Sequence, residues 1–230
     1  MKRISILQPS YLPWLGYFDQ MARSDAFVFL DDVQFTRRDW RNRNKIRVPE
    51  GWTWLTVPIT QKGKYEQTLV ETKIDCSTPW IEKHLKTVRS HYSKTPNFDL
   101  YFPPLESILS KRHGNLIDLC LETSLWLKDV LGIKTTIFRS SELLVEGLKG
   151  DRILNICRKL GATHYLSGDS ARGYLSEDDF SRYNITLEYQ EYKHPKYSQR
   201  YPGFEAHLSV VDLLFNCGEN SLNILSESGE

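Results

Sequence analysis

The fold is decided by residues 2–30, which read KRISILQPSYLPWLGYFDQMARSDAFVFL. Residues 3–7 are predicted to form a short strand, residues 15–22 a helix and residues 26–30 a second strand. Because the apolar run of this second strand is unbroken rather than alternating, it is typical of a parallel strand that is buried on both faces. The chain therefore opens with a βαβ unit, which predicts an α/β protein with a mainly parallel, Rossmann-like sheet.

The later segments continue this pattern and add a hairpin. Residues 45–48 and 53–59 flank a Pro-Glu-Gly turn, which predicts a β-hairpin beside the parallel strands and hence a mixed sheet. The periodicity of the remaining chain predicts strands at residues 135–138, 164–166 and 186–192 and helices at residues 78–92, 116–130, 151–160 and 208–215.

A single α/β domain is expected to span residues 1–218. The helices between about residues 78 and 132 are expected to form a helical cap over one side of the sheet. Residues 219–230 are polar and are expected to form a flexible tail. A chain of 230 residues can bury a substantial core without help from disulfides.

Charge and composition argue against several classes of protein. With 30 Lys and Arg residues against 29 Asp and Glu residues, the net charge is +1, so no overall field attracts nucleic acid or acidic membranes. The segment before Gln8 is too short for a signal-peptide core, and no apolar run approaches the roughly 20 residues that cross a bilayer. We therefore expect a cytoplasmic protein without a membrane span. The four widely spaced cysteines form no C-x-x-C motif, which predicts free buried thiols and no metal site.

The loop at residues 8–17 is the first candidate site, because it follows a strand and begins a helix where open α/β sheets bind ligands. Unpaired N–H groups at the helix start can hold a phosphate, and Gly16 allows another group to approach closely. A rigid turn with core aromatic residues is the alternative interpretation. The candidate ligand contacts are Gln8, Tyr11, Trp14 and Tyr17.

Two acidic residues follow the second strand at the same rim. Asp31 and Asp32 could orient a hydroxyl, hold Mg²⁺, act as a base, or cap a neighbouring turn. Residues 34–47 then combine five arginines and a lysine with two aromatic residues, and Arg43 and Asn44 are the candidate contacts. Such a segment could clamp phosphates, contact RNA, or form a solvated loop. The near-neutral charge favours a small anionic ligand over nucleic acid.

Two later loops supply further candidates. Residues 164–175 leave a strand through a glycine-spaced polar loop, whose backbone amides could wrap a phosphate while Arg172 supplies a counter-charge. Ser167, at the start of this loop, is a further candidate contact. His194 is the preferred general acid–base, with Tyr197 and Gln199 beside it. No G-x-S-x-G, H-E-x-x-H or dinucleotide-binding glycine motif is present, which weighs against hydrolases, zinc proteases and Rossmann dehydrogenases.

Taken together, these segments resemble the WbqC-like family. The resemblance runs nearly end to end and rests on residues 8–17, 29–35, 42–44, 165–168 and 208–216. It implies a place in bacterial O-antigen and surface-polysaccharide gene clusters, and therefore a pathway rather than a defined reaction.

A second, partial resemblance concerns nucleotidyltransferase-like ligases such as pantothenate synthetase. The opening strand, loop and helix are similar, although this chain carries no H-x-G-H sequence at the corresponding loop. The segment 170–176 is similar to a Ser-Ser-Arg segment that contacts the triphosphate in that enzyme. This resemblance implies phosphate contacts for Ser170 and Arg172. The cofactor stays open: ATP is a candidate through this resemblance, against which the missing H-x-G-H sequence counts, and Mg²⁺ is a candidate through the aspartate pair.

The function expected from these observations is that of a transferase or ligase. It would join an amino-acid or acyl group to an amino sugar, which is expected to be linked to a nucleotide, through an amide bond. Position and electrostatics would supply most of the catalysis. A protein that binds nucleotide-sugars or glycan enzymes without reacting is the first alternative, and an RNA-binding protein is the second. The oligomeric state stays open.

Overall fold

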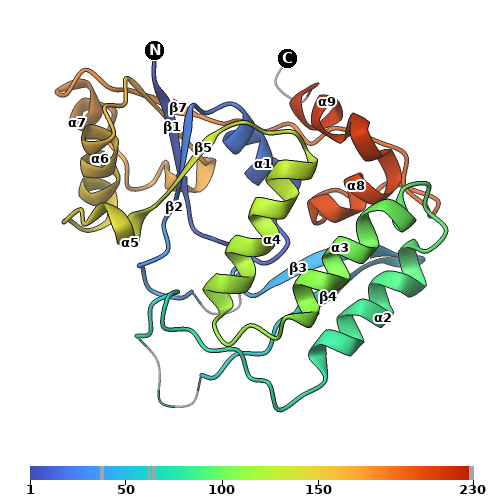
Figure 1. Ribbon diagram of the computed structural model, residues 1–230. Coiled ribbons are helices and arrows are strands. Elements are labelled where there is room, and N and C mark those ends of the chain that lie inside the picture. The colour runs from blue at the N-terminus through green and yellow to red at the C-terminus, as the bar shows by residue number, and fades with distance from the viewer. Residues whose placement is uncertain (37–38, 62, 64–65, 228–230) are drawn as a thin grey trace.

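A parallel β-sheet forms the centre of the molecule (Figure 1). The computed structural model describes residues 1–36, 39–61, 63 and 66–227. Within this part of the chain, five strands form one sheet in the order β5-β2-β1-β6-β7, and every neighbouring pair is parallel. The strands are β1 (Arg3–Leu7), β2 (Ala26–Phe29), β5 (Thr136–Arg139), β6 (His164–Ser167) and β7 (Thr186–Tyr189). The predicted α/β fold with a mainly parallel sheet is confirmed.

The register of the strands brings their carboxyl ends to one rim. Leu7 of β1 lies opposite Phe29 of β2, and Ser167 of β6 lies opposite Tyr189 of β7. The chain segments that follow these residues therefore leave the sheet at the same edge, as parallel strands require. Among them are the loop that begins at Gln8 and the loop that begins after Ser167, as the sequence predicted.

The β-hairpin does not join this sheet. Strands β3 (Arg43–Val48) and β4 (Gly51–Thr56) pair with each other in a separate antiparallel ribbon, so the prediction of a mixed sheet is wrong. Strands β5 and β7 occupy the two edges of the parallel sheet, and the hairpin instead buries Ile46 and Leu55 in the large apolar core. The hairpin thus contributes to the packing of the core through one face and pairs its backbone only with itself.

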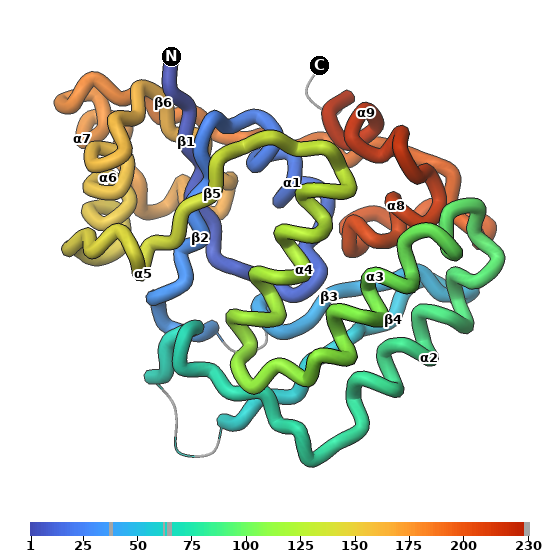
Figure 2. Tube along the Cα trace, viewed as in Figure 1, coloured from blue at the N-terminus to red at the C-terminus, as the bar shows by residue number. Residues whose placement is uncertain are grey.

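Helices cover both faces of the sheet (Figures 1 and 2). On one side lie α6 (Lys149–Lys159) and α7 (Glu177–Ser181), which enclose the smaller core with α5 (Ser140–Leu143) nearby. On the other side, residues of six helices contribute to the larger core. These helices are α1 (Leu15–Ala22), α2 (Trp80–Tyr92), α3 (Phe98–Ser110), α4 (Leu116–Val130), α8 (Val210–Cys217) and α9 (Ser221–Ser226).

Helix α3 was not predicted, because its sequence contains Pro103 and Pro104. A proline inside a helix removes a backbone N–H donor and usually interrupts the helix. Both prolines lie on the exposed face, where the backbone carbonyls that lose a partner can bond to water. The opposite face buries Phe102 and Leu105, and this apolar contact outweighs the local penalty.

The end of the described chain is also more ordered than expected. Residues 218–220 form a 3₁₀ turn, and α9 follows directly. Leu225 is fully buried in the larger core, so residues 221–226 are not a loose tail as predicted. The apolar residues Leu222 and Ile224 also pack against this core, which explains why a polar-looking segment docks. Residues 228–230 of the expected tail lie outside the described residues.

No helix in the described ranges combines the length and the apolar composition that crossing a lipid bilayer would require.

Candidate functional site

A cleft of about 580 Å³ lies at the carboxyl ends of β1 and β6, and we call it the rim cleft. Its walls come from the loop before α1, from residues 39–44, from the loop after β6 and from the segment after β7. A volume of this size suits a small-molecule ligand. Of the candidates named from the sequence, those that line the rim cleft are Gln8, Trp14, Tyr17, Asn44 and Ser170.

The loop before α1 is shaped by contacts with the hairpin. Leu12 has a positive φ of 44°, and the side chain of Asn44 donates to its carbonyl oxygen at 2.7 Å. Helix α1 begins after Trp14, whose indole ring folds back across Gly16. A Cβ at Gly16 would overlap this ring, so the close approach that the glycine allows is that of Trp14. Asn44 therefore acts on the loop conformation as well as lining the cleft.

Besides Arg41 Nε, three polar side-chain atoms of the rim cleft are buried and have no hydrogen-bond partner among the described residues. They are Gln8 Oε1, the Tyr17 hydroxyl and Gln20 Oε1. Tyr17 is 4% exposed and Gln20 is 2% exposed. Native structures leave few such atoms unpaired, because the loss of their hydrogen bonds to water costs about 1–3 kcal/mol each. Three in one cleft indicate that a polar ligand or ordered water belongs there.

Gln190 fixes which end of Gln20 stays unpaired. The side-chain nitrogen of Gln190 donates to the carbonyl oxygen of Gly16 and to Asp19 Oδ2, both at 2.7 Å. Since both partners are acceptors, this atom must be the Gln190 amide nitrogen. Gln190 Oε1 then accepts from Gln20 Nε2 at 2.8 Å, and Gln20 Oε1 is left as a free acceptor. Gln20 and Gln190 are cleft residues that the sequence analysis missed.

The Tyr17 hydroxyl is held in its neutral form. Its ring packs in the core beside Phe18 and Phe27, at centroid distances of 5.5 and 5.2 Å. Burial raises the pKa of Tyr17 well above its usual value, although the positive charge of Arg41 partly opposes this. A neutral phenol can both donate and accept one hydrogen bond, so it adapts to either kind of ligand group.

Arg41 supplies the positive charge of the rim cleft. Its Nη1 donates to the Ser10 hydroxyl at 2.9 Å and to the backbone oxygen of Gln8 at 3.2 Å. Its Nη2 pairs with Asp39 at 3.4 Å. The sequence could not single out Arg41 among five nearby arginines, because these partners lie about 30 positions earlier in the chain. Arg37 and Arg38 of the same segment lie outside the described residues.

Asp31 lies in a hydrogen-bonded network beside α5, and it does not line the rim cleft. Its Oδ1 accepts from the Ser141 N–H at 2.9 Å, and its Oδ2 accepts from Arg139 Nε at 2.7 Å. The hydroxyls of Ser140 and Ser141 also donate to it. Burial would raise the pKa of Asp31, but these bonds outweigh burial and lower it. The carboxylate thus orders the turn between β5 and α5.

Asp32 is engaged in the same way. It accepts from the Ser140 hydroxyl at 2.6 Å and forms an ion pair with Arg152. Because serine and arginine side chains hold both Asp31 and Asp32, the pair does not fit an Mg²⁺ site. Throughout the described ranges, no group of three or more His, Cys, Asp or Glu side chains is arranged to hold a metal ion.

His194 lies behind one wall of the rim cleft and is not part of its lining. Its ring is 6.1 Å from that of Tyr192 and 5.3 Å from that of His207, and Trp14 contacts both of these residues. Nδ1 bonds to the Pro195 carbonyl oxygen at 2.9 Å. Burial lowers the pKa of His194, and His207 adds to this effect. A catalytic role for His194 stays a prediction.

Tyr197 and Gln199 belong to a buried network around Asp212, outside the cleft. The Tyr197 hydroxyl donates to Asp212 Oδ2 at 2.8 Å, and Gln199 Nε2 donates to the same oxygen at 3.0 Å. Tyr92 donates to Asp212 Oδ1 at 2.7 Å. Burial raises the pKa of Asp212, and these hydrogen bonds oppose the rise only in part. The network ties α2 and α8 to the segment after β7.

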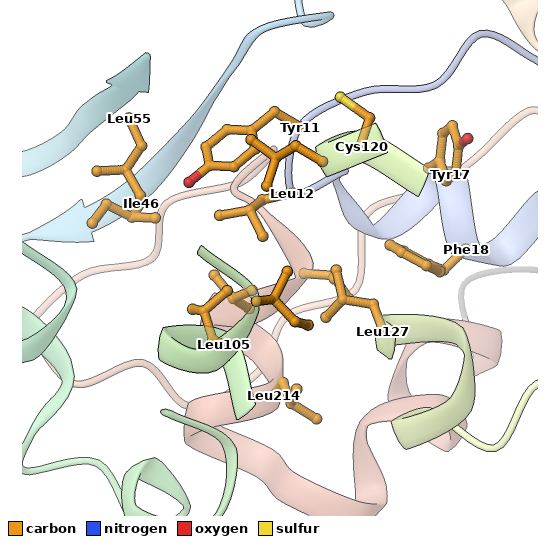
Figure 3. Packing of buried hydrophobic residues seen from close by; sticks show 14 of the residues in the cluster. Tyr11, Leu12, Tyr17, Phe18, Ile46, Leu55, Leu105, Cys120, Leu127 and Leu214 are labelled. Atoms are coloured by element: carbon orange, nitrogen blue, oxygen red, sulfur yellow. The ribbon is translucent and has the colours of Figure 1, made fainter. Parts of the chain in front are cut away.

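Tyr11 is a core residue and does not line the rim cleft. Figure 3 shows its ring packed with Leu12, between Ile46 and Cys120. Its hydroxyl bonds to His84 Nδ1 at 3.1 Å. Burial raises the pKa of Tyr11, so the hydroxyl stays protonated.

The last three candidates also lie outside the cleft lining. Ser167 is buried, and its hydroxyl donates to the carbonyl oxygen of Gly168 at 3.2 Å. Arg172 pairs with Asp169 at 2.9 Å and with Glu191 at 2.8 Å on the surface. Arg43 lies on the outer face of the hairpin, 4.2 Å from the centre of the Trp54 ring.

Comparison with known proteins settles the relationship that these segments suggested. A profile of the WbqC-like protein family matches residues 8–224. The chain belongs to the WbqC-like protein family. A relative from Mycobacterium tuberculosis (strain ATCC 25618 / H37Rv), described as "Uncharacterized protein Rv1507c", is 38% identical over 227 residues, which cover 98% of each chain. No solved structure matches the chain.

The segments that carry the WbqC-like resemblance now have positions in the structure. Residues 8–17 and 42–44 meet around Leu12 and contribute to the rim cleft, and residues 165–168 reach its opposite wall. Residues 208–216 instead hold Asp212, so this part of the resemblance reflects a buried structural network.

Proposed function

We propose that the rim cleft binds a nucleotide-linked amino sugar and that this WbqC-like protein is a transferase or ligase that forms an amide on the sugar's amine. The observation that carries the binding proposal is that three polar groups of the rim cleft, Gln8 Oε1, the Tyr17 hydroxyl and Gln20 Oε1, are buried and have no hydrogen-bond partner among the described residues. We place the step in the cytoplasm, within surface-polysaccharide biosynthesis, on the strength of the family resemblance.

The chemistry of these atoms matches such a ligand. Gln8 Oε1 and Gln20 Oε1 are acceptors and need N–H or O–H donors, which an amine and the hydroxyls of a sugar supply. Arg41 offers a guanidinium beside them, and guanidinium groups favour phosphate or carboxylate oxygens. The rim cleft therefore offers hydrogen-bond acceptors next to a cation, which suits a molecule that carries both a sugar and an anionic group.

The proposed reaction consumes an activated acyl donor. The lone pair of the sugar amine forms the C–N bond at the acyl carbon, the bond to the leaving group breaks with its electron pair, and the amine loses one proton. Acceptors that hold the amine would orient its lone pair, and this positioning is the main contribution that we assign to the protein. Asp169 of the cleft lining is the candidate acceptor for the proton.

Binding without reaction is the second candidate function, and one observation favours it. Both carboxylates of the described cleft lining pair with arginines: Asp39 with Arg41, and Asp169 with Arg172. Each arginine occupies an oxygen of the carboxylate that would have to accept the proton of the amine, which favours binding without proton transfer.

The decisive variant is Tyr17→Phe, which deletes only an unpartnered hydroxyl. The melting temperature without ligand should stay the same or rise slightly, because a buried unsatisfied group is removed. The affinity for UDP-glucosamine, measured by isothermal titration calorimetry, should fall about tenfold, which corresponds to the loss of roughly one hydrogen bond in a dry site.

Tyr197→Phe is the matched control, since its hydroxyl bonds to Asp212 outside the cleft. This variant should lose stability and keep its affinity for UDP-glucosamine. Equal affinities for the wild type and Tyr17→Phe, or no binding of UDP-glucosamine at all, would contradict the binding proposal. Binding without release of amide product from a panel of activated acyl donors would favour the second candidate function.

A further inference from the structure

Three tryptophans cluster at the outer face of the hairpin, and we call them the tryptophan shelf: Trp52 and Trp54 of β4, and Trp40, which precedes β3. The ring centres of Trp40 and Trp54 are 5.2 Å apart, and those of Trp52 and Trp54 are 5.4 Å apart. Trp40 is 37% exposed and Trp52 is 41% exposed. Large aromatic side chains that cluster on a surface commonly mark a place of binding. Trp40 also lines the rim cleft, so the shelf begins at the edge of that cleft.

Two cations lie over these rings. Lys45 is paired with Trp54 across the hairpin, and its Nζ is 3.9 Å from the centre of the Trp52 ring. The guanidinium of Arg43 is 4.2 Å from the centre of the Trp54 ring. Alternation along β3 sets residues 43 and 45 on this face and buries Ile46 on the other. Lys45 has no carboxylate within ion-pair distance in the part of the chain that the structure describes.

A hollow of about 450 Å³ lies next to the shelf, between β4 and the start of α2. We call it the hairpin hollow. Its lining includes Trp54, Trp80 and Lys83 together with the threonines Thr53, Thr56 and Thr87. Among the described residues that form this lining, none is an aspartate or a glutamate. The hollow therefore presents flat apolar rings, hydroxyls and positive charge together.

The histidine of the hollow does not add to this charge. Burial, together with a smaller effect of Lys83, lowers the pKa of His84 to about 4, although the bond to the Thr56 carbonyl partly opposes this. His84 Nε2 lies 3.1 Å from that carbonyl oxygen, and Nδ1 lies 3.1 Å from the Tyr11 hydroxyl. In the neutral ring, Nε2 donates to the carbonyl and Nδ1 accepts from Tyr11. The positive charge at neutral pH thus comes from Lys83, Lys45 and Arg43.

We propose that the tryptophan shelf and the hairpin hollow together bind an anionic saccharide. The apolar face of a sugar ring would pack on the exposed part of the tryptophan shelf, its hydroxyls would bond to the threonines, and its carboxylate would meet Lys45 or Lys83. Indoles provide large apolar contact surfaces together with an N–H donor, which suits a ligand that is apolar on its faces and polar at its edges. Because the ammonium of Lys45 has no carboxylate partner among the described residues, a negatively charged group on the ligand would complement it.

The geometry favours a saccharide over single-stranded RNA. RNA-binding platforms stack bases on open aromatic faces and line up cations along the phosphates. Here the planes of Trp40 and Trp54 are inclined by 53° and those of Trp52 and Trp54 by 78°, so the rings do not form parallel platforms for successive bases. Lys45 also covers the face of Trp52. The net charge of +1 gives no general attraction to a polyanion.

The test uses isothermal titration calorimetry of the full chain with tetragalacturonate at low salt. The wild type should bind this probe, and Lys45→Gln and Trp54→Ala should each weaken binding at least tenfold. Maltotetraose, which lacks carboxylates, should bind at least tenfold more weakly than tetragalacturonate. Lys134→Gln and Tyr183→Ala, which change an exposed lysine and an exposed tyrosine elsewhere, should bind as the wild type does.

The outcomes separate this inference from the others. No binding of tetragalacturonate, or equal affinities for the wild type and Lys45→Gln, would overturn it. The inference would be overturned in favour of RNA if a twelve-nucleotide oligouridylate bound more tightly than tetragalacturonate and if Lys45→Gln abolished this binding. The cleft variant Tyr17→Phe should keep its affinity for tetragalacturonate. Failure of the rim-cleft proposal would therefore leave this result unchanged.

Discussion

Replacement of Asp31 by asparagine tests whether this residue is structural. Its carboxylate is fully buried and accepts hydrogen bonds from Arg139 at 2.7 Å and from the N–H and hydroxyl of Ser141, both at 2.9 Å. Asparagine removes the charge and turns an NH₂ donor toward groups that are themselves donors. Breaking one partner of a buried ion pair costs about 3–5 kcal/mol. For a chain of this size, that loss corresponds to a fall of roughly 6–20 °C in melting temperature.

The pH dependence has a defined sign. Since the folded-state pKa of Asp31 lies below its unfolded value, the stabilisation is complete above the unfolded pKa of about 4 and is lost as pH falls through the folded pKa. Urea unfolding at pH 7 should therefore show the full difference between the wild type and Asp31→Asn. At pH 3 the difference should be smaller.

Asp129→Asn serves as the control, because Asp129 is exposed and pairs only loosely with Lys128 at 3.5 Å. It should change the free energy of unfolding by less than about 1 kcal/mol. The reasoning fails if Asp31→Asn is as stable as the wild type at pH 7 while its affinity for UDP-glucosamine is lost. That result would return Asp31 to the ligand site.

Three further substitutions probe the loop before α1 and the core beside it. Gly16→Ala should lower the free energy of unfolding by about 1–3 kcal/mol, because the added methyl overlaps the ring of Trp14; unchanged urea unfolding would refute this packing. Gln8→Ala should leave the melting temperature unchanged and weaken UDP-glucosamine binding, since its side chain has no partner in the described chain; the opposite pattern would make Gln8 a turn residue. His84→Gln should remove a pH dependence of the wild type. Because the folded-state pKa of His84 is about 4, below the usual 6.5, wild-type stability is complete above pH 6.5 and falls on the order of 3 kcal/mol toward pH 4. Equal slopes of stability against pH between 4 and 6.5 in both proteins would contradict this.

Local patterns in the sequence predicted the elements of the sheet and their shared rim. The unbroken apolar run at residues 26–30 gave a buried parallel strand, and the turn before Gly51 gave the hairpin. These predictions succeed because strand periodicity and turn chemistry depend on neighbouring residues. Helix α3 was missed because local patterns count its prolines against a helix. Only the burial of its other face, which is a tertiary contact, makes these prolines tolerable.

The composition of the site depended on contacts between distant segments. Gln20 and Gln190 meet across 170 positions, and Arg41 reaches the Gln8 carbonyl across 33. No local signal marks these residues as cleft residues. Conversely, Tyr197 was a candidate contact because it lies in a loop beside His194, and the structure buries it against Asp212, outside the lining of the rim cleft. Residue type and loop position therefore overestimated some candidates and missed others.

By itself, the sequence determined the βαβ opening, the parallel sheet, the rim where ligands are expected and the resemblance to the WbqC-like family. These follow from periodicity, turn residues and segment order, which are properties of short stretches of chain. Only the tertiary structure decided which polar atoms stay unpaired at that rim. Hydrogen bonds between Gln190, Gln20 and Asp19 form once β7 and α1 are packed together, and packing alone determines which acceptor atoms remain available to a ligand.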